Sequence, residues 1–252
     1  MIEFARRLLI LLKNVYGTLL LMKKYNQLFF DLDKTLWDFT ENSKDTFLDI
    51  FAIYKLHEKG IPSAEIFHKI YNKHNDHLWD QYRKGLVEKS FLSLQRFILA
   101  LSDFDINDRN LAEDMSKEYI RMSPLKTKLI PGTLEVLGYL SKKYSLHIIT
   151  NGFNEVQYIK IEKSGLKKYF DKIITSEEAG CNKPNKNIFL YSLEKASAKA
   201  NESLMIGDDI EVDILGAQDV GIDQVFLNIG NCIHKHSITY EIRSLKELIN
   251  IL

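Results

Sequence analysis

Short apolar runs alternate with longer stretches of helical periodicity from Tyr25 to the end of the chain. Five of these runs predict buried strands: Tyr25–Phe30, Leu146–Thr150, Lys172–Thr175, Leu204–Gly207 and Gln224–Leu227. The stretches between the later runs predict helices at Gly132–Lys143, Glu155–Lys163, Asn187–Ala200 and Val212–Val220. Because short buried strands separated by helices are typical of βαβ units, the pattern predicts an α/β fold with a parallel sheet.

The interval from Leu36 to Pro131 departs from this alternation, because it contains no convincing strand. Its periodicity predicts helices at Ser43–Tyr54, Ala64–Arg83, Lys89–Leu101 and Asp108–Met122. A helix set of this size, inserted after the first strand, should form its own small bundle. Since ligands bind beyond the carboxyl ends of parallel strands, we expect this bundle to act as a lid there. We therefore predict a core of residues 23–36 and 124–252 and a helical cap of residues 37–123.

Residues 1–22 are apolar and basic, but Lys13 and Asn14 interrupt the apolar run. A signal peptide needs an uninterrupted apolar core with a small-residue cleavage site, and a transmembrane helix needs about 20 apolar residues. Neither fits, so we expect no stable membrane association. Two interpretations stay open: an amphipathic surface helix, or an extension that arises from a translation start placed too early, with Met22 as the true start.

The composition narrows the class of partner. Of 252 residues, 45% are hydrophobic, which suffices for a core and a smaller second domain. Basic and acidic side chains number 34 each, so the formal net charge is zero and a nucleic acid polymer is not an expected partner. A small phosphorylated metabolite needs only a few local charges. The two cysteines, Cys181 and Cys232, are too few for a disulfide framework and fit a cytoplasmic protein.

The first predicted strand ends in two aspartates, Asp31 and Asp33. Residues two apart on a strand point the same way, so the strand end brings two carboxylates to the rim of the sheet. One carboxylate can act as a covalent nucleophile and form an aspartyl-phosphate, and the other can transfer protons.

Three later strand ends also carry polar residues: Thr150-Asn151-Gly152, Lys183-Pro184, and Gly207-Asp208-Asp209 with Asp213 shortly after. A helix start such as the one after Gly152 favours an anion, and clustered carboxylates suit Mg²⁺. Each of these segments alone is common in turns and helix caps. Their order and their shared position at strand ends favour one catalytic site.

With these four motifs in this order, the chain resembles the haloacid dehalogenase (HAD) superfamily, in its phosphatase branch with a helical cap, from about Lys23 to Leu252. The resemblance implies a Rossmann-like parallel sheet core with an inserted α-helical bundle cap. Two departures from the common motifs are Lys34, where glycine is usual, and Lys186, where proline is usual. We expect the Lys34 side chain to point away from the phosphate.

The resemblance also implies roles for individual residues. Asp31 would attack phosphorus, and Asp33 would protonate the leaving oxygen and then activate water. Thr150 and Lys183, with Asn151 and Gly152, would hold the phosphoryl group. The expected Mg²⁺ ligands are the Asp31 and Asp208 carboxylates and the Asp33 backbone carbonyl, with Asp209 or Asp213 acting through water. Asp33 argues against a true dehalogenase, because that branch lacks the second aspartate and uses no metal.

A finer resemblance concerns the substrate. Trp37-Asp38-Phe39, the segment Leu78–Gly85 and Arg96-Phe97 are similar to the noncanonical pyrimidine nucleotidase subfamily. This implies hydrolysis of pyrimidine nucleoside 5′-monophosphates. Trp37 and Phe39 either offer a stacking face to a base or pack the cap hinge. Arg83 or Lys84 either contacts the sugar or leaving group or lies in a solvated turn.

Two other functions stay open. One is a phosphatase of small sugar phosphates or phosphoglycolate, and the other is a binding protein of this fold that has lost catalysis. The intact set of candidate catalytic residues argues against the second. We expect a monomer or a homodimer.

Overall fold

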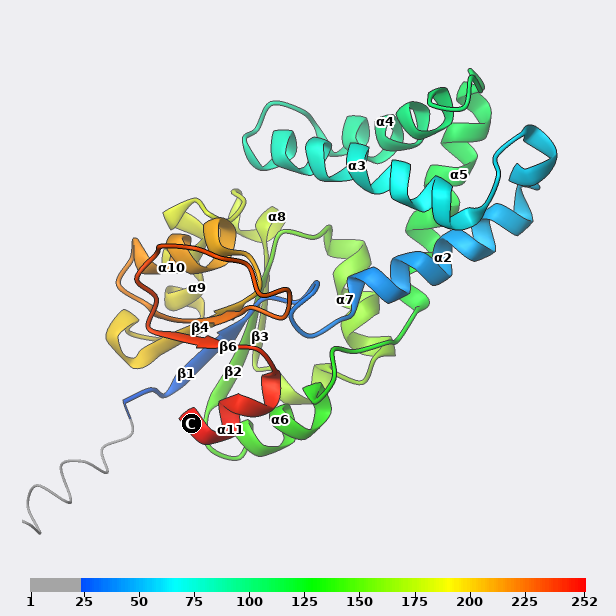
Figure 1. The fold of residues 1–252 in the computed structure, drawn as a ribbon. Helices are drawn as coiled ribbons and strands as arrows, with labels where there is room; N and C mark the ends of the chain where they lie inside the picture. Colours follow the sequence, from blue (N-terminus) through cyan, green and yellow to red (C-terminus); the bar gives the residue numbers. More distant parts are fainter. Residues whose placement is uncertain (1–23) are drawn as a thin grey trace, which may run out of the picture.

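One parallel sheet forms the centre of the protein, which is represented by a computed structural model that describes residues 24–252 (Figure 1). The extension expected at residues 1–22 lies outside the described residues. The strand order is β3-β2-β1-β4-β5-β6. The strands are β1 (Gln27–Phe30), β2 (Ser145–Thr150), β3 (Lys172–Thr175), β4 (Ser203–Gly207), β5 (Asp223–Leu227) and β6 (Tyr240–Ile242).

The chain builds this sheet outward from β1 in both directions. From β1 it moves to β2 and β3 on one side, and then returns to place β4, β5 and β6 on the other side. Phe30, the last residue of β1, pairs with Ile148 of β2 and with Ile206 of β4. A parallel sheet of this order binds ligands where the direction of winding changes, beyond the carboxyl ends of the strands. Here that point lies at the carboxyl ends of β1 and β4.

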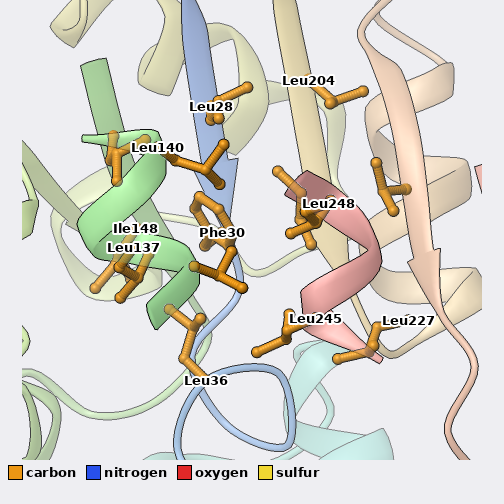
Figure 2. Close-up of a cluster of buried hydrophobic side chains, with 14 of the residues drawn as sticks. Leu28, Phe30, Leu36, Leu137, Leu140, Ile148, Leu204, Leu227, Leu245 and Leu248 are labelled. Atoms are coloured by element: carbon orange, nitrogen blue, oxygen red, sulfur yellow. The ribbon is translucent and has the colours of Figure 1, made fainter. Parts of the chain in front are cut away.

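Successive residues of β1 face opposite sides of the sheet, and each side is covered by helices. Leu28 and Phe30 belong to an apolar cluster with Leu137 and Leu140 of α6 (Thr133–Leu140) and Leu248 of α11 (Leu248–Ile251), as Figure 2 shows. The ring of Phe29 faces the other side, in a cluster with residues of α9 (Lys186–Lys195) and α10 (Gly216–Gln218). The core is therefore a three-layer α/β/α sandwich.

The cap consists of four helices: α2 (Phe39–Ile53), α3 (Ala64–Arg83), α4 (Lys89–Ser102) and α5 (Arg109–Met122). They form a separate bundle above the carboxyl ends of the strands (Figure 1). Its interior is aromatic, since the Phe47 ring lies within 6.1 Å of the ring centroids of Phe67, Tyr71, Phe97 and Tyr119. The bundle thus has an apolar core of its own.

Two neighbouring segments connect the cap to the core. The fully buried Trp37 donates a hydrogen bond from its indole Nε1 to the backbone oxygen of Lys126 at 3.0 Å. Asn42 donates to the Lys128 oxygen at 2.8 Å and accepts from the Lys128 N–H at 3.0 Å. The outgoing and returning segments are therefore joined side by side at one hinge.

The five predicted strands and the helical insertion are confirmed, with shifted ends. The helix predicted from Ser43 begins at Phe39, because the Asp38 carboxylate accepts a hydrogen bond from the Glu41 N–H and caps it there. The helix predicted at Val212–Val220 begins at Ile210 with π-type hydrogen bonding, because Asp209 caps it, and α10 follows.

Two predicted features differ more. The sequence pattern did not predict β6, whose three residues are too few to show strand periodicity. The helix predicted to reach Ala200 ends at Lys195. Within residues 24–252, no helix is long and apolar enough to cross a membrane.

Candidate active site

Asp31 follows β1 directly, at the point where the winding of the sheet changes direction. Its side chain is almost fully buried, and its Oδ1 accepts a hydrogen bond from Lys183 Nζ at 2.6 Å. Burial raises the pKa of the Asp31 carboxyl well above its usual range, and the Lys183 ammonium partly opposes this shift. The carboxylate therefore depends on nearby positive charge to stay ionised.

Lys183 lies between two carboxylates. Its Nζ donates to Asp31 Oδ1 and to Asp213 Oδ1, both at 2.6 Å, and to the backbone oxygen of Ile149 at 2.8 Å. Burial alone would lower the pKa of this amine, but the attraction of Asp213 and Asp31 outweighs burial and raises it. Lys183 is thus held as a cation at the base of the site.

The carboxylates at the ends of β1 and β4 are close enough to share a cation. Asp31, Asp208 and Asp213 each offer an oxygen, and these oxygens all lie within 4.8 Å of one another. Burial and the nearby Asp213 charge raise the pKa of Asp208 to about 7. Three carboxylate oxygens at this spacing are hard ligands that fit a divalent cation such as Mg²⁺, and such a cation would offset their negative charge.

The two candidates for the outer metal ligand, Asp209 and Asp213, make different contacts. Asp209 caps the helix that begins at Ile210, because its Oδ1 accepts from the N–H groups of Glu211 and Val212 at 3.0 Å. Asp213 instead lies in the carboxylate cluster. Gly207 allows this approach, since a Cβ there would lie 2.3 Å from Asp213 Oδ2.

Asn151 positions the segment that carries Lys183. Its Oδ1 accepts from the Lys183 N–H at 2.7 Å, and its Nδ2 donates to the Lys183 oxygen at 2.9 Å. The Thr150 hydroxyl oxygen accepts from the Gly152 N–H at 3.1 Å, where β2 passes toward α7 (Asn154–Lys163). This leaves the hydroxyl proton of Thr150 to donate to a bound anion.

Two residues of α7 that sequence reasoning missed hold the Asp33 carboxylate. Lys160 Nζ donates to Asp33 Oδ1 at 2.6 Å, and Gln157 Nε2 donates to Asp33 Oδ2 at 2.7 Å. Gln157 also donates to Thr150 Oγ1 at 2.6 Å, so it links Asp33 to Thr150. Both side chains are buried, and their signal in the sequence is a polar pair three residues apart beside the apolar Ile161.

The site opens into a cavity of about 390 Å³ between the core and the cap. The core contributes the four motifs named above, together with Lys34, Phe153, Gln157 and Lys160. The cap contributes Phe39, Asn75, Asp76, Trp79, Arg83, Arg96, Tyr119, Ile120 and Ser123. Arg83 is thus placed at the cavity, as is Phe39.

Trp37 and Lys34 follow the same motif but lie in different surroundings. The Trp37 ring is fully buried in the core cluster and does not line the cavity, which favours hinge packing and does not support its predicted contact with substrate. Lys34 lines the cavity with a φ of 69°, in the left-handed region that favours glycine, and its Nζ lies 5.8 Å from the Phe39 ring centroid.

The cap touches the core on the far side of the cavity from the hinge. Trp79 stacks on Phe153 with ring centroids 5.2 Å apart, and Lys89 Nζ lies 2.9 Å from both Glu155 and Glu177. Glu155 is in α7, and Glu177 is in α8 (Ser176–Ala179). The cap is therefore connected to α7 and α8 of the core as well as to the hinge.

Comparisons with known proteins agree with this geometry. The sequence profile of the family described as haloacid dehalogenase-like hydrolase matches residues 28–227. Pyrimidine 5′-nucleotidase YjjG of Escherichia coli is 33% identical over 91% of this chain and 98% of its own length. Pyrimidine 5′-nucleotidase PynA of Streptococcus pneumoniae is 28% identical over 90% of this chain and 95% of its own length. The magnesium-bound crystal structure of the HAD-hydrolase YfnB from Bacillus subtilis has a TM-score of 0.81 at 30% identity, over 91% of this chain and 99% of that one.

Proposed function

The chain belongs to the haloacid dehalogenase-like hydrolase family, and from this we propose that it is a Mg²⁺-dependent phosphatase whose substrates are pyrimidine nucleoside 5′-monophosphates. The observation that carries the proposal is the placement of Asp31 beside Lys183 and two further carboxylates, in a cavity between the core and the cap. An attacking carboxylate, a fixed ammonium and a set of hard oxygen ligands are what nucleophilic phosphoryl transfer requires.

The first chemical step joins an oxygen of Asp31 to phosphorus. The phosphorus–oxygen bond of the ester breaks as this bond forms, and the leaving oxygen takes a proton from Asp33. The Thr150 hydroxyl donates to a phosphoryl oxygen. The Lys183 ammonium, whose three N–H groups are donated to Asp31, Asp213 and Ile149, offsets the phosphoryl charge from beside Asp31. The product alcohol, a nucleoside in the proposed case, leaves an aspartyl-phosphate on Asp31.

The second step returns the enzyme to its starting state. Asp33 takes a proton from water, the water oxygen bonds to phosphorus, and the bond to Asp31 breaks to release inorganic phosphate. Gln157 and Lys160 hold the Asp33 carboxylate beside the reacting group throughout. Asp31, Asp208 and the Asp33 backbone carbonyl would hold Mg²⁺, which when bound would offset the charge of the phosphate.

The nucleotide assignment rests on similarity and on the cavity. Two relatives that align over nine-tenths of the chain are pyrimidine 5′-nucleotidases. The cavity offers the aromatic side chains of Phe39, Trp79 and Phe153, and a flat base can pack on such faces. Its volume of about 390 Å³ is in the range of small-molecule sites.

The test is phosphate release with Mg²⁺ from nucleoside monophosphates, sugar phosphates and phosphoglycolate, with Asp31→Asn as the control. We expect UMP, dUMP and dTMP to give the highest kcat/KM, with no release by Asp31→Asn or in the presence of excess EDTA. Preference for sugar phosphates or phosphoglycolate would contradict the substrate but not the mechanism. Turnover by Asp31→Asn would contradict the mechanism.

A further inference from the structure

Arg96 is a buried cation on the cap wall of the cavity. It lies on α4, its residue is 5% exposed, and it lines the same cavity as Asp31. None of the ion pairs within residues 24–252 includes Arg96. A guanidinium removed from water without a carboxylate partner is costly, and hydrogen-bond acceptors on a ligand would lower that cost.

The protein orients this guanidinium without using all of its donors. Arg96 Nη1 donates to Asn75 Oδ1 at 3.0 Å, and Nε donates to the backbone oxygen of Ser93 at 3.3 Å. Its carbon Cζ lies 5.1 Å from the Tyr119 ring centroid and 5.6 Å from that of Tyr71. A guanidinium has five N–H donors in a rigid fork, so three of them have no acceptor within residues 24–252.

The surroundings of Arg96 favour a neutral acceptor over an anion. Asp76 also lines the cavity, and its Oδ1 lies 3.5 Å from Asn75 Nδ2, the amide whose oxygen holds Arg96. A second phosphate or a carboxylate bound here would be repelled by the Asp76 carboxylate. A ring that carries both carbonyl oxygens and polar hydrogens finds donors on Arg96 and an acceptor on Asp76.

We propose that Arg96, oriented by Asn75, determines substrate choice by donating hydrogen bonds to a carbonyl oxygen of the pyrimidine base while the 5′-phosphate lies at Asp31. This inference rests on the proposed nucleotidase function. It assigns recognition of the base to the cap, at the opposite side of the cavity from the reacting phosphate.

The sharpest test compares UMP with ribose 5-phosphate, because the second compound keeps the sugar and the phosphate and lacks the base. We expect Arg96→Met to lower kcat/KM for UMP about 30-fold more than for ribose 5-phosphate. Only UMP carries the base, so only UMP loses a hydrogen bond to a charged group. Arg96→Lys keeps the positive charge but lacks the planar, forked set of donors, so it should restore only part of the preference for UMP over ribose 5-phosphate. The matched control is Arg109→Met, an exposed arginine of the cap that pairs with Glu113, and it should not change the ratio.

The variants also decide among other roles for Arg96. Equal losses on both substrates in folded Arg96→Met and Arg96→Lys, with thermal midpoints near that of the wild type, would show a structural role and overturn the inference. A larger loss on phosphoglycolate than on UMP would assign Arg96 to an anion instead. If Arg96→Met does not fold, the same comparison is made with Arg96→Lys and with Asn75→Ala, which frees the guanidinium from its acceptor.

Failure of the inference is separable from failure of the proposed function. If the wild-type enzyme hydrolyses UMP well and the variants keep its preference over ribose 5-phosphate, only the role of Arg96 is wrong. If the wild-type enzyme hydrolyses no nucleoside monophosphate, the proposed substrate class and the role of Arg96 are both wrong.

Discussion

On the core side of the cavity, the residues assigned to the reaction lie at or after strand ends, and on the cap side the polar residues lie on helices. The core group is Asp31, Thr150, Lys183 and Asp208. Asp31 and Asp208 follow β1 and β4, Thr150 ends β2, and Lys183 lies in the loop between α8 and α9. The cap group includes Asn75, Arg83 and Arg96, which belong to helices that otherwise pack their own apolar core. The Lys183 ammonium donates to three acceptors of the protein, whereas Arg96 donates to two and has further N–H groups for a ligand.

This difference suggests a division of labour. The charged groups of the core are paired with one another, so their arrangement depends little on which alcohol the phosphate is attached to. The cap groups are incompletely paired, so they can bind the alcohol part of the substrate. Changes in the core should therefore lower the rate for every substrate, and changes in the cap should alter the choice among substrates.

The largest expected effect comes from Lys183→Met. Removal of the ammonium leaves the buried Asp31 and Asp213 carboxylates facing each other, which should destabilise the fold by about 3–5 kcal/mol. Loss of a fixed cation at the transferred phosphoryl group should lower kcat about 10³-fold for UMP and ribose 5-phosphate alike. Urea unfolding and phosphate release measure the two effects, and a substrate-selective loss would break the comparison.

The matched control for that change is Lys186→Met. Lys186 is exposed and lies three residues further along the chain, at the start of α9. It should leave both the free energy of unfolding and the rates within experimental error. A loss comparable to that of Lys183→Met would mean that the segment, and not the ammonium, is responsible.

A smaller effect is expected from Gly152→Ala. A Cβ at this position would lie 2.2 Å from Gln157 Nε2 and 2.3 Å from Gln157 Cδ, so the Gln157 side chain must move. Its hydrogen bonds to Asp33 and Thr150 would break, and kcat should fall about 10- to 100-fold for both substrates. This is less than the about 10²- to 10⁴-fold loss expected on removal of a proton-transfer group, because Asp33 remains and only its position changes. Gly138→Ala is the control, because that helical glycine has open space around it and should gain about 0.5–1 kcal/mol of stability. An unchanged kcat in Gly152→Ala would show that Gln157 does not position Asp33.

The smallest effect is expected from Lys89→Gln, at the contact between the two regions. Lys89 connects the cap to Glu155 and Glu177 of the core through partly exposed ion pairs, which contribute about 0.2–1 kcal/mol each. We expect a two- to five-fold rise in KM for both substrates at low salt, which disappears at high salt because ions screen the pairs. Lys69→Gln, an exposed lysine elsewhere on the cap, should leave KM unchanged. A KM that rises for UMP alone would mean that Lys89 acts on the base and not on cap closure.

The two regions also differ in how far the sequence predicts them. The positions of Asp31, Thr150, Lys183 and Asp208 follow from local motifs, because parallel strands bring their carboxyl ends to one edge of a sheet. No such rule places Gln157, Lys160 or Arg96. Their inward direction depends on how α7 and α4 pack, and helix packing is decided by contacts distant in sequence.

The ambiguous residues illustrate the same limit. An aromatic residue after the nucleophile is compatible with stacking on a base or with packing at a hinge, and only its surroundings decide. Trp37 is covered by Lys160, whose Nζ lies 4.2 Å from its ring centroid, and it donates to the returning segment at Lys126. Phe39, two residues later, reaches the cavity.

The single hinge at Trp37 and Asn42 has a consequence for how such enzymes diversify. The chain leaves the core and re-enters it at adjoining points, so everything between Asp38 and Lys128 is a cassette with both ends fastened at one place. Exchange of that cassette would leave the register of the sheet and the position of Asp31 unchanged. Selection on this lineage can therefore rewrite which metabolite is accepted while the phosphate chemistry is inherited unchanged.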